Sequence, residues 1–181
     1  MRTVIVFESM FGNTEDRARE IAAGLRAAGV ATTLSDVRQV RADDLAGCDL
    51  LVVGAPTHAF SLSRPSTRKD AVSQGADPAR AAVGVREWLA TLDDAFPARA
   101  DRPSVAVFDT RVAKVRRLPG SAAKRAARVL RAQGFAVLDR PTSFYVEDVK
   151  GPVLRGEPER AEAWGVLLAE RLGVQHRRDA S

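Results

Sequence analysis

The 181-residue chain contains few of the side chains that commonly build metal centres and disulfides. It has one cysteine, Cys48, and two histidines, His58 and His176. A single cysteine cannot close a disulfide within the chain, and these three residues provide no recognisable zinc-binding spacing. We therefore expect no metal site. The low cysteine content fits a reducing compartment such as the cytoplasm.

Long apolar runs are also missing. The longest ones end well before the roughly 18 to 20 residues that a membrane-spanning helix requires. The N-terminus leads directly into a strand-like run, residues 2–7, without the charged and apolar segments of a secretion signal. We expect a cytoplasmic protein that does not insert into a membrane.

Several catalytic and nucleotide-binding motifs are absent. Neither the dinucleotide pattern G-x-G-x-x-G nor the phosphate loop of nucleoside triphosphatases occurs in the chain. Ser9 stands at an expected strand-to-helix turn, where some hydrolases place a nucleophile, but it lacks the flanking glycines of that motif. These absences argue against hydrolase chemistry.

The formal net charge is +5, yet 24 of the 28 basic residues are arginine. A general bias toward arginine explains this excess as well as a selected surface does, so we predict no nucleic-acid partner. One stretch is distinctive, because residues 111–131 contain eight Lys or Arg and no Asp or Glu. This stretch is either an ordinary solvated helix face or a surface for an anionic partner.

Continuously apolar, β-branched segments predict strands that are buried on both faces of a sheet. They comprise residues 3–7, 50–54 and 104–108, with weaker strands at 30–35 and 135–138. Between them, apolar residues recur at helical spacing. The predicted helices cover residues 13–28, 85–92, 122–133 and 161–172. Strands that alternate with helices predict a doubly wound α/β fold with five parallel strands.

The length favours a single domain, which we place at residues 1–174. We expect the polar segment 175–181 to be a disordered tail. In a doubly wound sheet the ligand crevice lies beyond the carboxyl ends of the strands. Three predicted loops leave those ends, at residues 8–14, 55–78 and 109–120. The second is unusually long, which is typical of a functional lid or contact surface, and the alternative is a disordered insertion.

The first of these loops is rich in hydrogen-bond donors. Ser9 and Thr14 carry hydroxyls, Gly12 permits close backbone approach, and Asn13 adds an amide. The predicted helix that follows presents unpaired N–H groups and the positive end of its dipole, so a phosphate would bind well here. The alternative is an ordinary turn in which Asn13 caps the helix.

The run Ser9-Met10-Phe11-Gly12-Asn13-Thr14 resembles the phosphate loop of flavodoxin-like proteins, and the resemblance extends over nearly the whole chain. It implies a flavodoxin-like doubly wound α/β fold with the strand order 2-1-3-4-5 and helices on both faces. It also implies flavin mononucleotide (FMN) as the cofactor, bound by the three loops named above. Phe11 departs from the hydroxyl residue that many flavodoxins have at that position.

By the same resemblance, the second loop contributes cofactor-binding residues that would lie beside the flavin ring. These residues are Pro56, Thr57, His58, Ala59 and Phe60. His58 or Phe60 could stack on the ring, although solvent exposure of His58 and core packing of Phe60 are the simpler alternatives.

The third loop would contribute Asp109, Thr110 and Arg111, but it lacks the tyrosine that flavodoxins usually place over the outer face of the ring. The flavin would then be more exposed, or a partner would stack in that place. The only tyrosine of the chain, Tyr145, is either a residue at the edge of the sheet or a flavin contact.

Three functions remain open. The first is an electron carrier with an acidic redox partner protein, because a basic rim attracts negative charge. The second is an FMN-dependent NAD(P)H:quinone oxidoreductase. Its nicotinamide substrate would be held through its phosphates by Arg64, Arg68, Lys69 or Arg111. The third is an interaction module that has the fold without the flavin.

Overall fold

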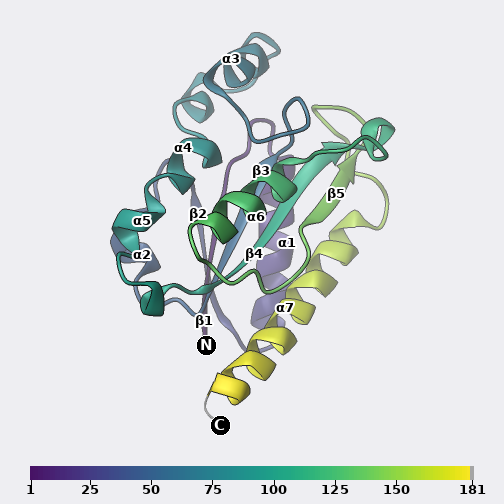
Figure 1. The fold of residues 1–181 in the computed structure, drawn as a ribbon. Helices are drawn as coiled ribbons and strands as arrows, with labels where there is room; N and C mark the ends of the chain where they lie inside the picture. Colours follow the sequence, from purple (N-terminus) through teal and green to yellow (C-terminus); the bar gives the residue numbers. More distant parts are fainter. Residues whose placement is uncertain (180–181) are drawn as a thin grey trace.

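A five-stranded parallel sheet forms the centre of the molecule in the computed structural model, which describes residues 1–179. The strands are β1 (Arg2–Phe7), β2 (Ala31–Asp36), β3 (Leu50–Pro56), β4 (Ser104–Val112) and β5 (Thr142–Val146). Their spatial order is β2-β1-β3-β4-β5, and each neighbouring pair is parallel (Figure 1). The expected fold class and strand order are confirmed.

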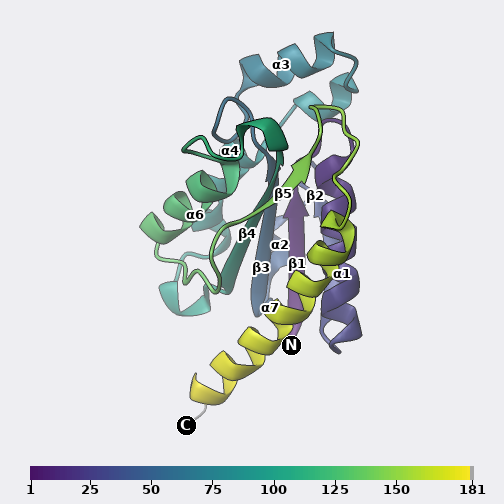
Figure 2. The same ribbon diagram turned by 90° about the vertical axis from the view of Figure 1, so that its right-hand side faces the viewer.

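Helices cover both faces of this sheet, as Figure 2 shows in side view. The α-helices are α1 (Asn13–Ala27), α2 (Ala42–Leu45), α3 (Pro65–Ser73), α4 (Val85–Leu89), α5 (Leu92–Ala95), α6 (Ala122–Ala132) and α7 (Glu157–Asp179). Short 3-10 turns occur at η1 (Pro78–Ala81), η2 (Arg99–Asp101) and η3 (Ala113–Val115). Helices α1 and α7 lie on one face, and α4 and α6 lie on the other. None of these helices is both long and apolar enough to span a bilayer.

The two faces have separate hydrophobic cores, because successive strand residues point in opposite directions. Under α1 and α7, the rings of Phe108, Phe144 and Trp164 meet edge to face, with centroid separations of 5.9 to 6.2 Å. Such aromatic arrangements add to the burial energy of the rings. This cluster holds β4, β5 and α7 together.

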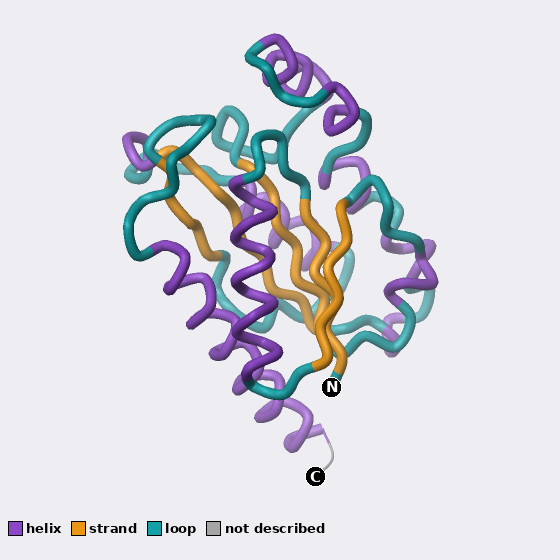
Figure 3. Tube along the Cα trace, turned by 180° about the vertical axis from the view of Figure 1, so that it is seen from behind, coloured by secondary structure: helices purple, strands orange, loops and turns teal. Residues whose placement is uncertain are grey.

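Helices α1 and α7 approach each other closely at two glycines, and Figure 3 shows them crossing on one face of the sheet. A Cβ atom on Gly24 would lie 2.0 Å from the carbonyl oxygen of Glu162. A Cβ atom on Gly165 would lie 2.2 Å from the carbonyl oxygen of Ile21. A side chain at either position would collide with the backbone of the other helix. The two glycines therefore permit the close packing of α7 against α1.

The fifth strand was predicted in the wrong place. Residues 135–138 contribute only an isolated bridge between Val137 and Val105, whereas β5 occupies residues 142–146. The apolar character of 135–138 has another cause, because Phe135 is buried in the core under α6. Strand β5 instead pairs with the second half of β4, from Phe108 onward.

The expected disorder of 175–181 differs from the structure, because α7 continues to Asp179. Residues 180–181 lie outside the described part of the chain. Gln175 accepts a hydrogen bond from Ser104 at 3.1 Å, and His176 lies 3.4 Å from Asp49. These contacts hold the end of α7 against the base of the sheet.

The long second loop is partly helical. It contains α3 and η1, which project beyond the carboxyl ends of the strands (Figure 1). Ala71 and Ala76 pack on Met10 of the first loop, and Arg68 is buried at 2% exposure. The segment is therefore anchored to the neighbourhood of the first loop.

Candidate functional site

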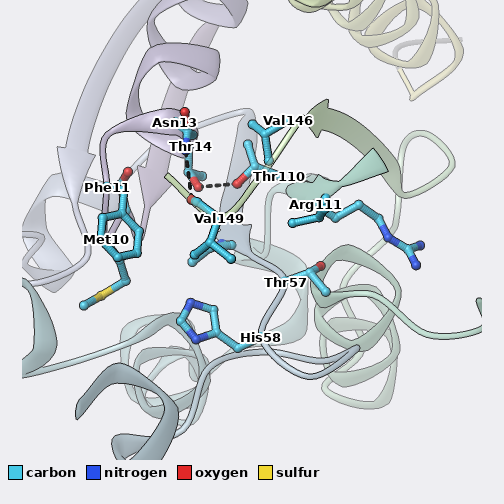
Figure 4. A pocket seen from close by; sticks show the side chains of 13 residues that line it. Met10, Phe11, Asn13, Thr14, Thr57, His58, Thr110, Arg111, Val146 and Val149 are labelled. Atoms are coloured by element: carbon cyan, nitrogen blue, oxygen red, sulfur yellow. Dashed lines mark hydrogen bonds between the residues drawn. The ribbon is translucent and has the colours of Figure 1, made fainter. Parts of the chain in front are cut away.

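A cleft opens where β1, β3 and β4 end, as expected for a doubly wound sheet. Its lining residues come from all three predicted loops and from the segment after β5, and Figure 4 shows them around the opening. They are Ser9, Met10, Phe11, Asn13, Thr14, Pro56, Thr57, His58, Thr110, Arg111, Val112, Val146 and Val149. Gly12, Ala59, Phe60 and Asp109 were predicted as site residues but do not line the cleft.

The first loop exposes backbone donors at the start of α1. Gly12 has φ 94°, a left-handed conformation that favours glycine, and a Cβ atom placed on it would meet nothing within 4 Å. Its N–H donates to Ser9 Oγ at 3.1 Å. Within residues 1–179, the N–H groups of Phe11, Asn13 and Thr14 have no hydrogen-bond acceptor. Asn13 does not cap the helix with its side chain, so the capping alternative is not supported.

A buried hydrogen bond joins the first and third loops. Thr14 Oγ1 and Thr110 Oγ1 lie 2.7 Å apart, and both residues are at most 6% exposed (Figure 4). Arg80, from η1, donates to the carbonyl of Ser9 at 3.0 Å and to Glu15 at 3.1 Å. The first loop is therefore held from two sides, which fixes the direction of its free N–H groups.

Among the residues that the structure describes, no carboxylate lines the cleft. The nearby acidic groups point elsewhere: Glu8 accepts from the N–H of Val85 at 2.8 Å, and Asp109 accepts from the N–H of Ala123 at 2.8 Å. Burial raises the pKa of Glu8 above its usual value. Free N–H donors without a facing carboxylate form a site that suits an anion. Among residues 1–179 there is also no group of three His, Cys, Asp or Glu side chains placed to hold a metal.

The second loop forms a tight turn. His58 and Ser61 exchange two backbone hydrogen bonds of 2.9 and 3.0 Å, and the two residues between them, Ala59 and Phe60, have φ 45° and 62°. His58 faces the cleft, and burial lowers the pKa of its imidazole, so the ring is neutral at neutral pH (Figure 4). Phe60 is 45% exposed and contributes to a different pocket.

The third loop contributes one cation to the cleft. Arg111 is 5% exposed and donates to the carbonyls of Val115 at 2.6 Å and Leu118 at 3.1 Å. Its guanidinium points away from the centre of the cleft in Figure 4. Asp109 is fully buried beneath the N-terminus of α6, where it accepts from the N–H of Ala123, and Ser121 is the N-cap of that helix. Arg68, another predicted phosphate ligand, is buried and lies 3.1 Å from Glu87.

The sequence model of the flavodoxin family matches residues 5–68, which include the end of β1, the first loop, β2 and β3. The fold is flavodoxin-like. No sequence among the curated proteins matches it.

Solved structures of flavodoxins share the fold. A flavodoxin from the domain Archaea superposes with a TM-score of 0.65 and 17% identity, covering 96% of this chain and 99% of its own. The two-electron reduced flavodoxin of Megasphaera elsdenii gives 0.61 and 19%, covering 93% and 98%.

Rubredoxin oxygen:oxidoreductase from Desulfovibrio gigas is also similar, with a TM-score of 0.66 and 18% identity. The match covers 96% of this chain but 36% of that one, so it concerns one part of a larger protein. At these identities the superpositions show the fold alone.

The segment after β5 was not predicted as a cleft wall. Val146, the last residue of β5, and Val149 line the cleft, and Asn13 Nδ2 donates to the carbonyl of Val149 at 3.3 Å. Lys150 Nζ lies 5.9 Å from the ring centroid of Phe11, within cation–π range. The sequence gives no sign that a valine lines a binding site. It does indicate a loop in this region, because Gly151-Pro152 is a typical turn sequence. Tyr145 is in β5 and does not line the cleft, which favours the sheet-edge alternative.

The residues of this flavodoxin-like cleft fit FMN. Three free N–H groups can donate hydrogen bonds to a phosphate, and no carboxylate of the described residues opposes it. The apolar and neutral surfaces of Met10, His58 and Val149 surround the mouth, where a flat ring can be desolvated.

Proposed function

We propose that this chain binds FMN at the cleft and acts in electron transfer. The observation that carries the proposal is the set of N–H groups of Phe11, Asn13 and Thr14, which have no acceptor in the described residues and face a cleft without carboxylates. Such a set stabilises an anion through charge-assisted hydrogen bonds and the helix dipole. A phosphate monoester is the ligand that fits this chemistry and the fold.

Each loop would have its own task in holding the cofactor. The first loop would bind the phosphate, and the hydroxyl of Thr57 and the imidazole of His58 would lie along the ring. His58 contributes no charge at neutral pH, because burial lowers its pKa. Bound FMN supplies the redox chemistry, and the protein supplies position and electrostatics.

The cations near the third loop favour an acidic redox partner. Lys114, Arg116 and Arg117 are exposed in the segment between β4 and α6, and none of them forms an ion pair within residues 1–179. Opposite charges accelerate encounter, and salt screens them. Electron transfer to an acidic partner should therefore slow as ionic strength rises, which stopped-flow measurements would detect.

Fluorescence titration tests the FMN proposal. The purified chain should quench FMN fluorescence on binding and should bind riboflavin, which lacks the phosphate, at least tenfold more weakly. Equal affinity for both ligands would show that the first loop does not bind phosphate. If FMN is not bound at all, the chain is an interaction module with this fold.

A matched pair of glycine variants locates the phosphate site. Gly12 and Gly29 both have positive φ, 94° and 79°, and a Cβ atom on either would meet nothing within 4 Å. Gly12→Ala and Gly29→Ala should therefore lose similar stability through backbone strain. Only Gly12→Ala should lose FMN affinity, because only Gly12 lies in the first loop. Similar FMN affinities of the two variants would contradict this placement.

An NAD(P)H:quinone oxidoreductase is the second candidate function. The observation that favours it is that the third loop contributes no aromatic side chain to the cleft lining. Without such a side chain, the side of the cleft formed by the third loop is open to a substrate. Steady-state assays with NADPH or NADH and a soluble quinone distinguish it from a carrier. Rapid turnover would favour the oxidoreductase, and negligible turnover would favour the carrier.

A further inference from the structure

A second pocket lies on the outer side of the turn formed by residues 58–61, between that turn and the first half of α6. We call it the basic pocket. Its lining residues are Phe60, Ser61, Arg64, Arg86, Gly120, Ser121, Lys124, Arg125 and Arg128. Five of these nine residues are cations and none is acidic. The FMN cleft and the basic pocket share no lining residue, so they are separate sites.

The cations of the basic pocket are not neutralised by the protein. None of the five forms an ion pair among the residues that the structure describes. Glu87 lies next to Arg86 in the chain, but its carboxylate contacts Arg68 at 3.1 Å and the N–H of Gly84 at 3.0 Å. Lys124 and Arg128 are one helical turn apart on α6, where like charges repel. An anion in the pocket would relieve this repulsion.

Arg86 is held in place at the pocket wall. Its Nε donates to the carbonyl of Ser63 at 2.7 Å, and its Nη2 donates to the carbonyl of Leu62 at 2.7 Å. Burial, followed by repulsion from Arg64 and Arg125, lowers the pKa of its guanidinium. The neighbouring positive charges are thus close enough to act on one another. Because its Nε and Nη2 are occupied, Nη1 is left to contact a ligand.

Phe60 supplies a flat surface at the same pocket. The turn gives it φ 62°, a conformation that a bulky residue rarely adopts, and its side chain is 45% exposed. Gly120, on the opposite wall, lies close to this turn. A Cβ atom added to Gly120 would be 2.8 Å from the carbonyl oxygen of Phe60. An exposed aromatic ring beside clustered cations suits a ligand that carries both an aromatic base and phosphates.

We propose that the basic pocket binds a nucleotide with clustered phosphates, its base on Phe60 and its phosphates on Arg64, Arg86 and the cations of α6. Clustered phosphates match several cations in one concave site better than the separate carboxylates of an acidic protein do. The site adjoins the turn that carries His58, so a bound nucleotide would lie next to the proposed flavin site. The binding itself does not require FMN, and its test is independent of the proposed function.

Calorimetric titration of the chain without flavin tests the proposal, with 2′,5′-ADP, ATP, inorganic pyrophosphate, adenosine and poly-glutamate as probes. At least one of the two nucleotides should bind at 0.1 M salt, tenfold or more tighter than pyrophosphate and adenosine. Preference for 2′,5′-ADP would identify a ribose-phosphate ligand, and preference for ATP a polyphosphate ligand. Binding of poly-glutamate without binding of either nucleotide would overturn the proposal in favour of an acidic protein.

Charge-matched variants locate the binding. The double variant Arg125→Gln/Arg128→Gln should weaken nucleotide binding at least tenfold. The control Lys114→Gln/Arg116→Gln removes the same charge outside the pocket and should change it less than threefold. Phe60→Leu should weaken nucleotide binding and leave pyrophosphate binding unchanged. Equal losses in the two double variants would overturn the proposal, because they would indicate attraction by net charge alone.

Discussion

Replacing Ala59 by glycine should stabilise the free protein, although such a change usually destabilises. Ala59 is exposed and has φ 45°, so its Cβ atom makes the left-handed backbone unfavourable. That conformation costs an L-residue about 1–2 kcal/mol. Glycine removes this cost, while its greater freedom in the unfolded chain returns about 0.4–1 kcal/mol. Subtraction of these two terms leaves a net gain between about 0 and 1.6 kcal/mol, and about 0.8 kcal/mol from the midpoints of the two ranges.

The turn itself should survive the change, because its two hydrogen bonds join the backbones of His58 and Ser61. For a chain of this size, about 0.8 kcal/mol raises the melting temperature by about 2–3 °C. Urea unfolding followed by circular dichroism gives the free energy directly. The control is Ala98→Gly, at an exposed alanine with φ −88°, which should lose about 0.4–1 kcal/mol. If both variants lose stability equally, the turn is not strained and the reasoning is wrong.

Three further predictions concern the core and the buried polar groups. Gly24→Ala should cost more than about 3 kcal/mol in urea unfolding, above the usual range for overpacking, because its Cβ atom meets the backbone of α7. Thr110→Val should cost about 1–3 kcal/mol, because it leaves a buried hydroxyl of Thr14 without its partner. The double variant with Thr14→Val should cost less than the two single losses combined. Glu8 has a pKa raised above 4.5, so its contribution to stability is largest below pH 4.5 and falls as pH rises through the folded-state pKa. The difference in unfolding free energy between Glu8→Gln and the parent should therefore shift in favour of the variant as pH rises from 4 to 8. A difference that does not change with pH would contradict a raised pKa of Glu8.

The central strands could be predicted because burial on both faces leaves a continuous apolar signal. This held for β1, β3 and β4, and alternation with helices then gave a parallel, doubly wound sheet, whereas the strand order came from the family resemblance. It failed for β5, because Phe135 is equally apolar but packs under α6 instead of joining the sheet. An apolar segment predicts that its residues are buried. It does not distinguish a strand within the sheet from a loop that packs under a helix.

The site could be predicted in part for a related reason. The first loop is a local feature, because the residues from Ser9 to Thr14 are contiguous and their donors follow from a turn and a helix start. The wall at Val149 depends on a contact with Asn13, which is far away in the sequence. The basic pocket likewise brings Arg64 and Arg86 to α6 only after folding. Long-range contacts of this kind leave no periodic or local pattern to detect.

The crossing of α1 and α7 at Gly24 and Gly165 makes the first loop, at the start of α1, depend on a helix that is synthesised much later. While a ribosome is still making the segments before α7, one side of α1 has no neighbour and its apolar residues are exposed. The first loop therefore gains its full support only after α7 has emerged from the ribosome. Loss of α7 should therefore weaken the FMN binding proposed for the first loop, without altering any residue that lines the cleft.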